Sequence, residues 1–326
     1  MDVFVTGGSG FVGQHLLRTL AGAGHRVRAL ARSSVSAGIV AAAGAEPSRG
    51  DVTDREAMHQ GMQGCEVVMH AAAHTEQWGP PARFEQINVG GTEAVLAAAR
   101  SAGVGRVVHL STEAVLADGR PLVRVDETYP RPEHQIGEYA RTKALAEQRV
   151  LAANGDGLAT VVVRPRFVWG PGDTTILPAL VDAARRGRYA WIDGGRYLTS
   201  TCHVLNACAG IALAAERAKA GEIYFLTDGE PVELREFLTA LAATEGATLP
   251  DRSMPRRLAW AVAVAAEGAW KLLRLASEPP ITRTFLALSA QEMTVDDSKA
   301  RREFGYRPVL SREAGLAALA GSEPAS

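Results

Sequence analysis

Cysteine is scarce in this chain, and a segment typical of an export signal is missing. Its three cysteines are Cys65, Cys202 and Cys208, which form no Cys-x-x-Cys pair and no spacing typical of a disulfide framework. The first expected strand begins at Val3, which leaves no room for a charged and apolar leader. These absences predict a protein of the reducing cytoplasm.

An excess of charge of one sign is missing too. The 35 lysines and arginines nearly balance the 36 aspartates and glutamates, and the sequence contains no long basic run. A surface that tracks phosphates needs such a run, so we expect no nucleic-acid partner. His70 and His74 have a spacing of four, but they flank an alanine run after a strand end rather than lying on a helix. We therefore expect no metal site.

No hydrophobic run is long enough to cross a bilayer. The most apolar run, Leu258–Ala266 with the sequence LAWAVAVAA, follows the basic pair Arg256 and Arg257. It is much shorter than the roughly 20 residues of a membrane span. Charged residues follow it at helical spacing: Glu267, Lys271, Arg274 and Glu278. We expect a helix over 258–278 that is buried all round at its start and half exposed at its end. A substrate lid and a peripheral membrane contact are the alternatives.

The first half of the chain alternates short apolar runs with longer segments in which apolar residues recur at three and four. This alternation predicts an α/β fold, a Rossmann-type doubly wound parallel sheet with a smaller, mixed C-terminal substrate domain. The expected strands are Val3–Thr6, Val27–Ala31, Glu46–Asp51, Val67–Ala71, Arg106–Ser111 and Thr160–Arg164. The expected helices are Phe11–Ala21, Arg55–Met62, Asn88–Ala102 and Glu138–Ala153.

The regular alternation stops near Gly170, where Pro171, Gly172 and Pro178 interrupt the pattern. We therefore predict a cofactor-binding domain over 1–170 and a substrate-binding domain over 171–326. A helix over His203–Ala218 and a strand over Gly221–Leu226 are expected to return to the edge of the first sheet.

A glycine-rich turn joins the first expected strand to the first expected helix. Gly7 would allow the tight turn, Gly10 the approach of a pyrophosphate, and Gly13 close packing of helix and strand. The helix N-terminus then offers free N–H groups to the phosphates. A purely structural turn is the alternative, which the strand–turn–helix context disfavours. The expected cofactor contacts are Gly7, Ser9, Gly10, Phe11, Val12 and Gly13.

The end of the second strand indicates which dinucleotide binds. A site that prefers NAD normally has Asp or Glu here, whereas this strand ends at Ala31 and continues with Arg32 and Ser33. A guanidinium and a hydroxyl suit a ribose 2′-phosphate, so we predict that NADP(H) is preferred over NAD(H). The alternative is that Arg32 is a solvated surface residue.

Tyr139 and Lys143 are four residues apart and so share one face of an expected helix. A phenol with a pKa of about 10 is a poor base at neutral pH. A nearby ammonium and the positive nicotinamide ring favour its ionisation. Lys143 would also hold the nicotinamide ribose. Of the two hydroxyls at the end of the fifth strand, Ser111 and Thr112, we choose Thr112 to bind the substrate oxygen. Chance spacing and a helix cap are the alternatives.

Taken together, these motifs make the chain resemble the extended short-chain dehydrogenase/reductases over nearly its whole length. The motifs are TGGSGFVG at 6–13, GDVTD at 50–54, VVMHAAA at 67–73, NVGGT at 88–92, YARTK at 139–143 and RPRFVWGPGD at 164–173. The resemblance implies that further residues line the cofactor, alongside Tyr139 and Lys143: Asp51 and Val52 at the adenine, Ala71, Ala72, Ala73 and Asn88 along its length, and Pro165 and Val168 near the nicotinamide. It also implies a homodimer through the helices Asn88–Ala102 and Glu138–Ala153.

Within that family the C-terminal third most resembles the 3β-hydroxysteroid dehydrogenase branch, on the segments EPPITR at 278–283 and DSKARREFGYRP at 297–308. The resemblance implies hydride transfer between NADP(H) and a secondary alcohol or ketone on a bulky, largely apolar substrate. A nucleotide-sugar epimerase or dehydratase is the alternative enzyme. It is disfavoured by Leu116-Ala117 in place of Tyr-Gly and by a single acidic residue, Glu113, after Thr112. A third alternative is a cofactor-sensing protein without catalysis. The presence of Thr112, Tyr139 and Lys143 disfavours it, because such a protein needs none of them.

Overall fold

A seven-stranded parallel sheet lies at the centre of the computed structural model, which describes residues 1–273, 275 and 277–321. The strand order is β12-β7-β5-β4-β1-β2-β3, so the predicted doubly wound parallel sheet is confirmed. The strands are β1 (Asp2–Thr6), β2 (Arg26–Ala31), β3 (Glu46–Arg49), β4 (Val67–His70), β5 (Arg106–Leu110), β7 (Ala159–Pro165) and β12 (Glu222–Leu226). The apolar runs of β1, β4, β5 and β7 are buried because helices cover both faces, whereas the edge strand β3 is polar and largely exposed.

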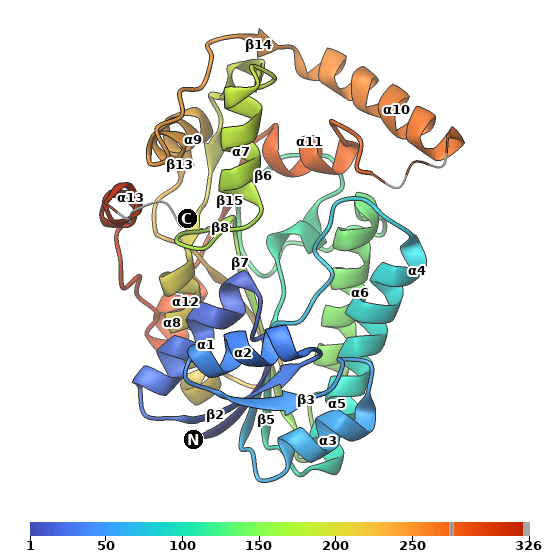
Figure 1. Ribbon diagram of the computed structural model, residues 1–326, viewed down its shortest axis with the longest axis vertical. Helices are drawn as coiled ribbons and strands as arrows, with labels where there is room; N and C mark the ends of the chain where they lie inside the picture. Colours follow the sequence, from blue (N-terminus) through green and yellow to red (C-terminus); the bar gives the residue numbers. More distant parts are fainter. Residues whose placement is uncertain (274, 276, 322–326) are drawn as a thin grey trace.

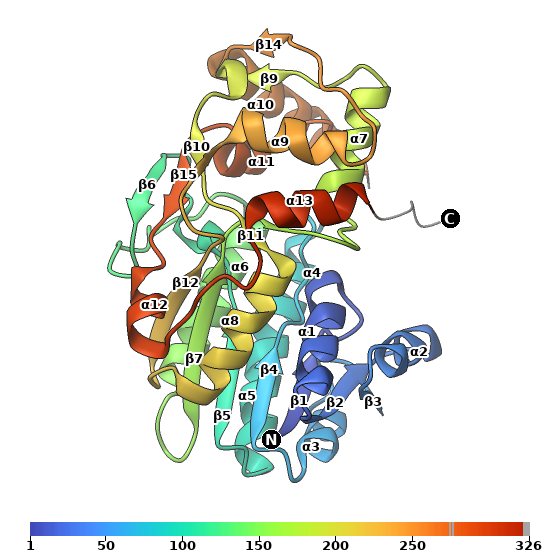
Figure 2. The ribbon, with the colours of Figure 1, turned by 90° about the vertical axis from the view of Figure 1, so that its left-hand side faces the viewer.

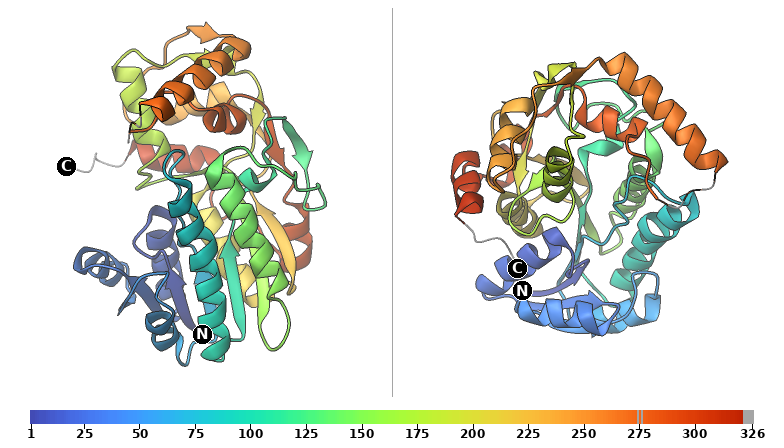
Figure 3. Two further views of the ribbon diagram at one scale, coloured as in Figure 1. Left: turned by 90° about the vertical axis from the view of Figure 1, so that its right-hand side faces the viewer. Right: turned by 45° about the horizontal axis from the view of Figure 1, so that its top comes forward.

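Two layers of helices enclose this sheet (Figures 2 and 3). Helices α1 (Phe11–Gly22), α2 (Ser34–Ala42) and α8 (Val204–Arg217) contribute to the apolar core on one face. The core on the other face is formed with α3 (Arg55–Met62), α5 (Gly91–Ser101) and α6 (Gly137–Ala152). The homodimer expected through α5 and α6 stays a prediction.

Two local features of this domain differ from expectation. Helix α2 was not predicted; Ser33 begins it with a capping box, accepting from the Ser36 N–H while the Ser36 hydroxyl accepts from the Ser33 N–H. The helix expected to start at Asn88 starts earlier, with α4 (Pro81–Phe84) leading into a π-helix, η1 (Glu85–Gly90), before α5. A π-turn inserts a residue into the helical pattern, so periodicity alone does not mark this start.

A second lobe covers the end of the sheet opposite the N-terminus (Figures 1 and 2). Its four-stranded sheet has the order β13 (Val232–Glu233), β10 (Leu198–Thr199), β15 (Met293–Val295), β6 (Leu122–Val125). Two small sheets pair β8 (Val168–Trp169) with β11 (Cys202–His203), and β9 (Trp191–Ile192) with β14 (Ser253–Met254). The remaining helices are α7 (Ile176–Arg185), α9 (Leu234–Ala243), α10 (Arg256–Leu272), α11 (Arg283–Ser289), α12 (Ser298–Phe304) and α13 (Arg312–Ala320).

The chain passes between the two lobes more than once. Strand β6 comes from the first half of the sequence, yet it pairs with β15 in the second lobe. In the opposite sense, β12 leaves the second half and pairs with β7 at the edge of the large sheet. The division at residue 170 stays a prediction, and the exchanged strands tie the two lobes together.

Helix α10 contradicts the expectation that the run Leu258–Ala266 is buried all round. In this run Ala259 and Ala263 are buried against α11 and Trp260 is partly buried there, whereas Leu258 is 53% exposed and Val262 42% exposed. Helix α11 covers one side of α10, and α10 projects from the second lobe (Figure 3). Residues 274 and 276 of the expected helix lie outside the described residues. No helix in the described part of the chain is long and apolar enough to span a membrane.

The contact between the glycine turn and α1 can be tested with Gly13→Ala. A Cβ at Gly13 would clash with the carbonyl oxygen of Gly7, so we expect the variant to lose about 1–3 kcal/mol of unfolding free energy. Gly22→Ala, in the same helix with open space around it, is the matched control. Urea unfolding followed by circular dichroism measures both, and equal stability of the two variants would contradict the prediction.

Candidate active site

The predicted site residues gather where the parallel strands end. The carboxyl ends of β1, β4, β5 and β7 face the second lobe, and their adjacency follows from the strand order. The crevice outside these strand ends is where open α/β sheets bind ligands. The glycine turn follows β1, the alanine run follows β4, and Thr112 follows β5.

The turn after β1 has the shape that a pyrophosphate needs. Gly7 has a φ of 76°, in the left-handed region, and a Cβ there would meet the Ala71 backbone at 2.7 Å. Gly10 is the N-cap of α1 without a side-chain hydrogen bond to the helix, and no acidic residue lies in the first turn. The Gly10 N–H donates to Gly7 O, whereas the N–H groups of Phe11, Val12 and Gly13 in the first turn of α1 fit an anion.

The adenosine end of the predicted cofactor site lies beyond β2. Ala31 is buried, while Arg32 is exposed with no hydrogen-bond or ion-pair partner among the described residues. The Ser33 hydroxyl accepts from Ser36 as the cap of α2. Asp51 accepts from the Thr53 backbone and hydroxyl, and Val52 is buried. Arg32 is thus a cation without a partner among the described residues at this end, as is Arg49, which lies opposite Ala31 on β3.

Two hydroxyls hold the end of β4 in a fixed geometry. Ala71, Ala72 and Ala73 are partly exposed, and the Ala72 N–H donates to Thr6 Oγ1. His70 lies between Thr6 Oγ1 at 2.7 Å and Thr92 Oγ1 at 2.9 Å. Burial lowers the pKa of His70 to about 3, so the ring is neutral. Because Thr92 donates its own proton to Asn88 O, we infer that His70 carries its proton on Nε2.

Asn88 connects three parts of the site from within the π-helix. Its Oδ1 accepts from the His74 N–H at 2.7 Å, and its Nδ2 donates to His74 O at 3.1 Å. Nδ2 also donates to Thr142 Oγ1 at 3.0 Å, which ties α6 to the loop after β4. The side chain is buried and its hydrogen bonds are internal, so Asn88 fixes the cofactor-facing loop rather than capping a helix.

Lys143 is a buried cation at the centre of the site. Its Nζ donates to Leu110 O at 2.7 Å and lies 3.3 Å from His109 Nε2. Burial lowers the pKa of Lys143 to about 8, and the negative charge of Glu147 opposes this shift. Burial also holds the pKa of His109 well below its usual value, so its Nε2 accepts from the ammonium. One of the three ammonium donors is left for a ribose hydroxyl.

A buried carboxylate, Glu147, organises the charges behind Lys143. Arg164 donates to both oxygens of Glu147, at 2.9 and 2.5 Å, and the Ser111 hydroxyl donates at 2.7 Å. These contacts join α6 to β5 and β7. Ser111 is held at the Glu147–Arg164 pair, whereas Thr112, which donates to Glu113, is the strand-end hydroxyl beside the predicted base.

Thr112, Tyr139 and Glu113 form a connected polar line. The Thr112 hydroxyl donates to Glu113 Oε2 at 2.9 Å. Burial and the negative charge of Glu113 raise the pKa of the Tyr139 phenol, while the neighbouring Thr112 side chain lowers it. The phenol is consequently protonated at neutral pH in this structure.

An arginine that sequence reasoning missed completes this line. Arg166 Nη1 lies 3.1 Å from Glu113 Oε1, and both side chains are nearly fully buried. Of the two predicted neighbours, Pro165 ends β7 and is buried, whereas Val168 opens β8 and is partly exposed. A sequence signal existed, because a charged residue lies within three positions after each of two apolar strands, Glu113 after β5 and Arg166 after β7, and charged residues are seldom buried at such strand ends. The ion pair between Glu113 and Arg166 could not be predicted from the sequence, because they follow different strands.

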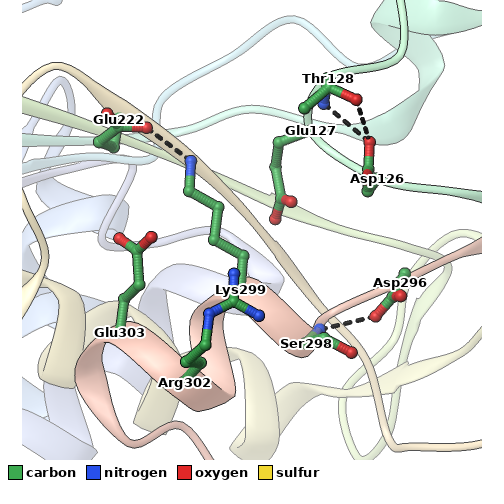
Figure 4. Close-up of a pocket in the computed structure, with 9 residues that line it drawn as sticks. All are labelled: Asp126, Glu127, Thr128, Glu222, Asp296, Ser298, Lys299, Arg302 and Glu303. Carbon is green, nitrogen blue, oxygen red and sulfur yellow. Dashed lines mark hydrogen bonds and ion pairs between the residues drawn. The ribbon is translucent and has the colours of Figure 1, made fainter.

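A separate polar pocket lies beside the sheet edge (Figure 4). It is lined by Asp126, Glu127, Thr128, Glu222, Asp296, Ser298, Lys299, Arg302 and Glu303, none of which is a predicted site residue. Lys299 donates to Glu222 at 2.6 Å, so its charge is already paired. In the described part of the chain, no group of three or more His, Cys, Asp or Glu residues is arranged to hold a metal ion.

Comparison with known proteins assigns this arrangement to a family. The model of the 3-beta hydroxysteroid dehydrogenase/isomerase family matches residues 4–256. A 4-hydroxy-2-methyl-3-oxo-4-farnesyl-3,4-dihydroquinoline-1-oxide ketoreductase from Stigmatella aurantiaca is 52% identical over 325 residues, covering 100% of this chain and 97% of the relative. A 2-alkyl-3-oxoalkanoate reductase from Stenotrophomonas maltophilia is 40% identical, covering 100% of both chains.

A solved structure with bound cofactor has the same fold. It is a dTDP-glucose 4,6-dehydratase from Streptomyces venezuelae with NAD bound, 26% identical with a TM-score of 0.76, covering 98% of this chain and 96% of that one. Sugar-nucleotide enzymes are therefore related to this chain in fold, while its more similar relatives are reductases. The predicted resemblance to extended short-chain dehydrogenase/reductases is confirmed.

The cost of burying Lys143 gives a pH-dependent stability. Its pKa is about 8 in the folded protein against 10.5 as its ordinary value. Below pH 8 Lys143 is charged in both the folded and the unfolded protein, so the folded protein is destabilised by the full cost of burying the charge. Between pH 8 and 10.5 Lys143 loses its proton in the folded protein only, and this cost disappears. Relative to Lys143→Met, the wild-type unfolding free energy should rise by about 3 kcal/mol between pH 7 and 10.5.

Urea unfolding at a series of pH values measures this difference. Lys219→Met, which removes an exposed lysine, is the control for loss of one positive charge. A wild-type minus Lys143→Met difference that does not change with pH would contradict the prediction.

Proposed function

This chain belongs to the 3-beta hydroxysteroid dehydrogenase/isomerase family, and we propose that it reduces a 3-oxo group on a bulky, largely apolar substrate with NADPH. It is an NAD(P)-dependent oxidoreductase of the short-chain type that acts on hydroxyl and keto groups. The preference for the phosphorylated cofactor, the roles of individual residues and the substrate are our proposals.

The observation that carries this function is the position of a protonated phenol beside a strand-end hydroxyl, on the same helix as a buried ammonium. The Thr112 side chain acts on the pKa of Tyr139, and Lys143 lies one helical turn from Tyr139 on α6. Such a pair can hold a carbonyl oxygen from two sides and stabilise the negative charge that develops on it. Thr112 is the proposed oxygen ligand and Tyr139 the proposed acid.

The direction follows from the state of the phenol. Bound nicotinamide supplies or accepts the hydride. Reduction of a ketone then needs a proton at the product oxygen, and the Tyr139 phenol has one to donate because burial and Glu113 raise its pKa. The Lys143 ammonium stabilises the phenolate left behind. Alcohol oxidation requires the phenolate at the outset, so we propose ketone reduction as the favoured direction at neutral pH.

The names of the two relatives narrow the substrate class. Both names give an oxo group at carbon 3, an alkyl or methyl group at carbon 2, and an oxygen on atom 1, as an oxide or an alkanoate. One also carries a farnesyl group. We propose the same 3-oxo, 2-alkyl pattern with a large apolar group for this chain. We place that apolar group at the second lobe, which lies over the ends of the strands that carry the site (Figure 2).

Reduction of an ethyl 2-methyl-3-oxoalkanoate tests the function directly, through loss of absorbance of reduced nicotinamide. A sugar-nucleotide epimerase would show no net cofactor turnover with this ketone or with a nucleotide sugar. A cofactor-sensing protein would bind NADPH and leave the ketone unchanged. Net oxidation of NADPH by the ketone separates the proposed activity from both.

Tyr139→Phe tests the proposed acid. The variant keeps the ring but loses the proton donor, so kcat should fall by at least about 100-fold while cofactor affinity stays within twofold, on the order expected for general acid catalysis. Stopped assays measure kcat, and quenching of tryptophan fluorescence measures NADPH binding. A variant with near-normal kcat would refute the role of Tyr139.

The proposed preference for NADP(H) is supported by the residues beyond β2. Ala31 has no carboxylate to bind a ribose 2′-hydroxyl, and Arg32 is a free guanidinium beside the N-terminus of α2. A 2′-phosphate would receive a charge-assisted hydrogen bond from Arg32 and the favourable end of the α2 dipole.

Arg32→Asp should weaken NADP binding by at least about tenfold and leave NAD binding little changed, because only the phosphate is repelled. Arg257→Asp, on the outer surface of α10, makes the same charge change elsewhere. Kd values for both cofactors measure the effect. A wild-type preference for NAD, or equal losses for both cofactors, would contradict the proposal.

A further inference from the structure

We propose that Arg166 binds an oxygen anion on the substrate, next to the reacting 3-oxo group, and that Glu113 is the counter-ion that holds Arg166 in place. The inference rests on the proposed function and deepens it by naming the group that sets substrate selectivity. In chemical terms, the favoured substrate carries a carboxylate or an N-oxide oxygen on the atom two bonds from the ketone carbon.

The position of Arg166 relative to Thr112, the proposed ligand of the reacting oxygen, supports this role. Thr112 donates to one oxygen of Glu113 at 2.9 Å, and Arg166 lies 3.1 Å from the other. A single carboxyl group therefore separates the hydroxyl proposed to bind the reacting oxygen from a guanidinium. Two substrate oxygens on atoms 1 and 3 have a comparable spacing, so one can bind at Thr112 while the other reaches Arg166.

Arg166 also lies at the junction of the two lobes. Its Nη2 donates to Leu288 O at 2.8 Å and lies 3.3 Å from Thr199 Oγ1, both in the second lobe. Its guanidinium carbon lies 5.4 Å from the centre of the Phe167 ring. The arginine thus spans from the reacting groups to the lobe that we propose holds the apolar part of the substrate.

The hydrogen bonds of Arg166 are incomplete. Its Nε is buried and has no partner among the described residues. Buried donors are seldom left unpaired, because the group loses its water without replacement. A substrate oxygen would satisfy this donor with a charge-assisted hydrogen bond. Arg164 also has one buried donor without a partner among the described residues, its Nη1, but two of its nitrogens donate to Glu147, whereas Arg166 reaches Glu113 through Nη1 alone.

The charge balance of the buried cluster leaves room for one more negative charge. The buried charged side chains around the site are three cations, Lys143, Arg164 and Arg166, and two carboxylates, Glu113 and Glu147. A buried ion pair is by itself a weak source of stability, so the Glu113–Arg166 pair has no clear structural advantage over apolar residues. An anionic substrate would compensate the remaining positive charge.

Two matched ligands test this inference: 2-methyl-3-hydroxydecanoate, which is chemically stable, and its methyl ester, which lacks the anion. Calorimetric titration into NADPH-loaded enzyme, in which the hydroxy ligands cannot be oxidised, gives the Kd ratio of ester to acid without turnover. We expect the wild type to bind the acid at least about tenfold more tightly. Oxidation of both ligands with NADP gives the corresponding ratio of kcat/KM.

Two variants should change this ratio in opposite directions. Glu113→Gln removes the counter-ion and leaves Arg166 more attractive to an anion, so the preference for the acid should increase. The double variant Glu113→Gln/Arg166→Gln removes both charges without leaving an unpaired one, and the preference should fall to about twofold or less. General damage to the site would not produce opposite effects. Arg301→Gln, which removes another paired arginine on α12, should leave the ratio unchanged.

Equal binding of acid and ester by the wild type would overturn the inference. So would a shift in the same direction for both variants, or an equal shift in Arg301→Gln. If the double variant does not fold, Glu113→Gln alone decides the question, since a ratio that fails to rise contradicts the role of Arg166. If both ligands bind but neither they nor the 3-oxo ester react, the proposed function fails while the binding ratio still tests Arg166.

Discussion

The burial of the Lys143 ammonium constrains the arrangement of the whole site. A charge without water needs polar groups around it, and the protein provides Leu110 O, the neutral ring of His109 and the negative charge of Glu147. Each of these requires another element in a fixed position. Strand β5 contributes the carbonyl and the histidine, while β7 contributes the arginine that pairs with Glu147. Lys143 and Glu147 together therefore tie α6 to β5 and β7.

A second consequence is the state of the neighbouring phenol. Lys143 turns toward β5, so in the protein without cofactor the strongest charge acting on Tyr139 is that of Glu113, which favours the protonated phenol. The site is thereby prepared for protonating a product oxygen. Glu113 in turn is held by Arg166, and the same ion pair joins the end of β5 to the chain leaving β7. Proton chemistry and the contact between the two lobes thus share one carboxylate.

The second lobe has a core rich in aromatic side chains, and its helix α10 is largely exposed to solvent. Trp169 and Phe237 pack edge to face within its core. Helix α10 presents large apolar side chains outward, and at its far end Lys271 lies 5.9 Å from the centre of the Trp78 ring in the first lobe. The helix therefore reaches from one lobe to the other. Whether it covers the substrate or contacts a membrane stays a prediction.

The sequence by itself determined the features that depend on neighbouring residues. The alternation of apolar runs predicted the strands of the large sheet, because each strand and helix carries its own periodicity. The glycine turn from Gly7 to Gly13 was readable because all its residues are consecutive, and Tyr139 and Lys143 because one helical turn joins them.

Only the tertiary structure decided which distant residues meet. Glu113 follows β5 and Arg166 follows β7, and their ion pair exists because these strands are neighbours in the sheet. Asn88 had the sequence pattern of a helix start, yet its side chain holds the loop at His74 and α6. The run Leu258–Ala266 looked like a buried helix, but apolar composition does not say whether a partner covers each face. Pairing and burial depend on the packing of whole elements, which no local pattern records.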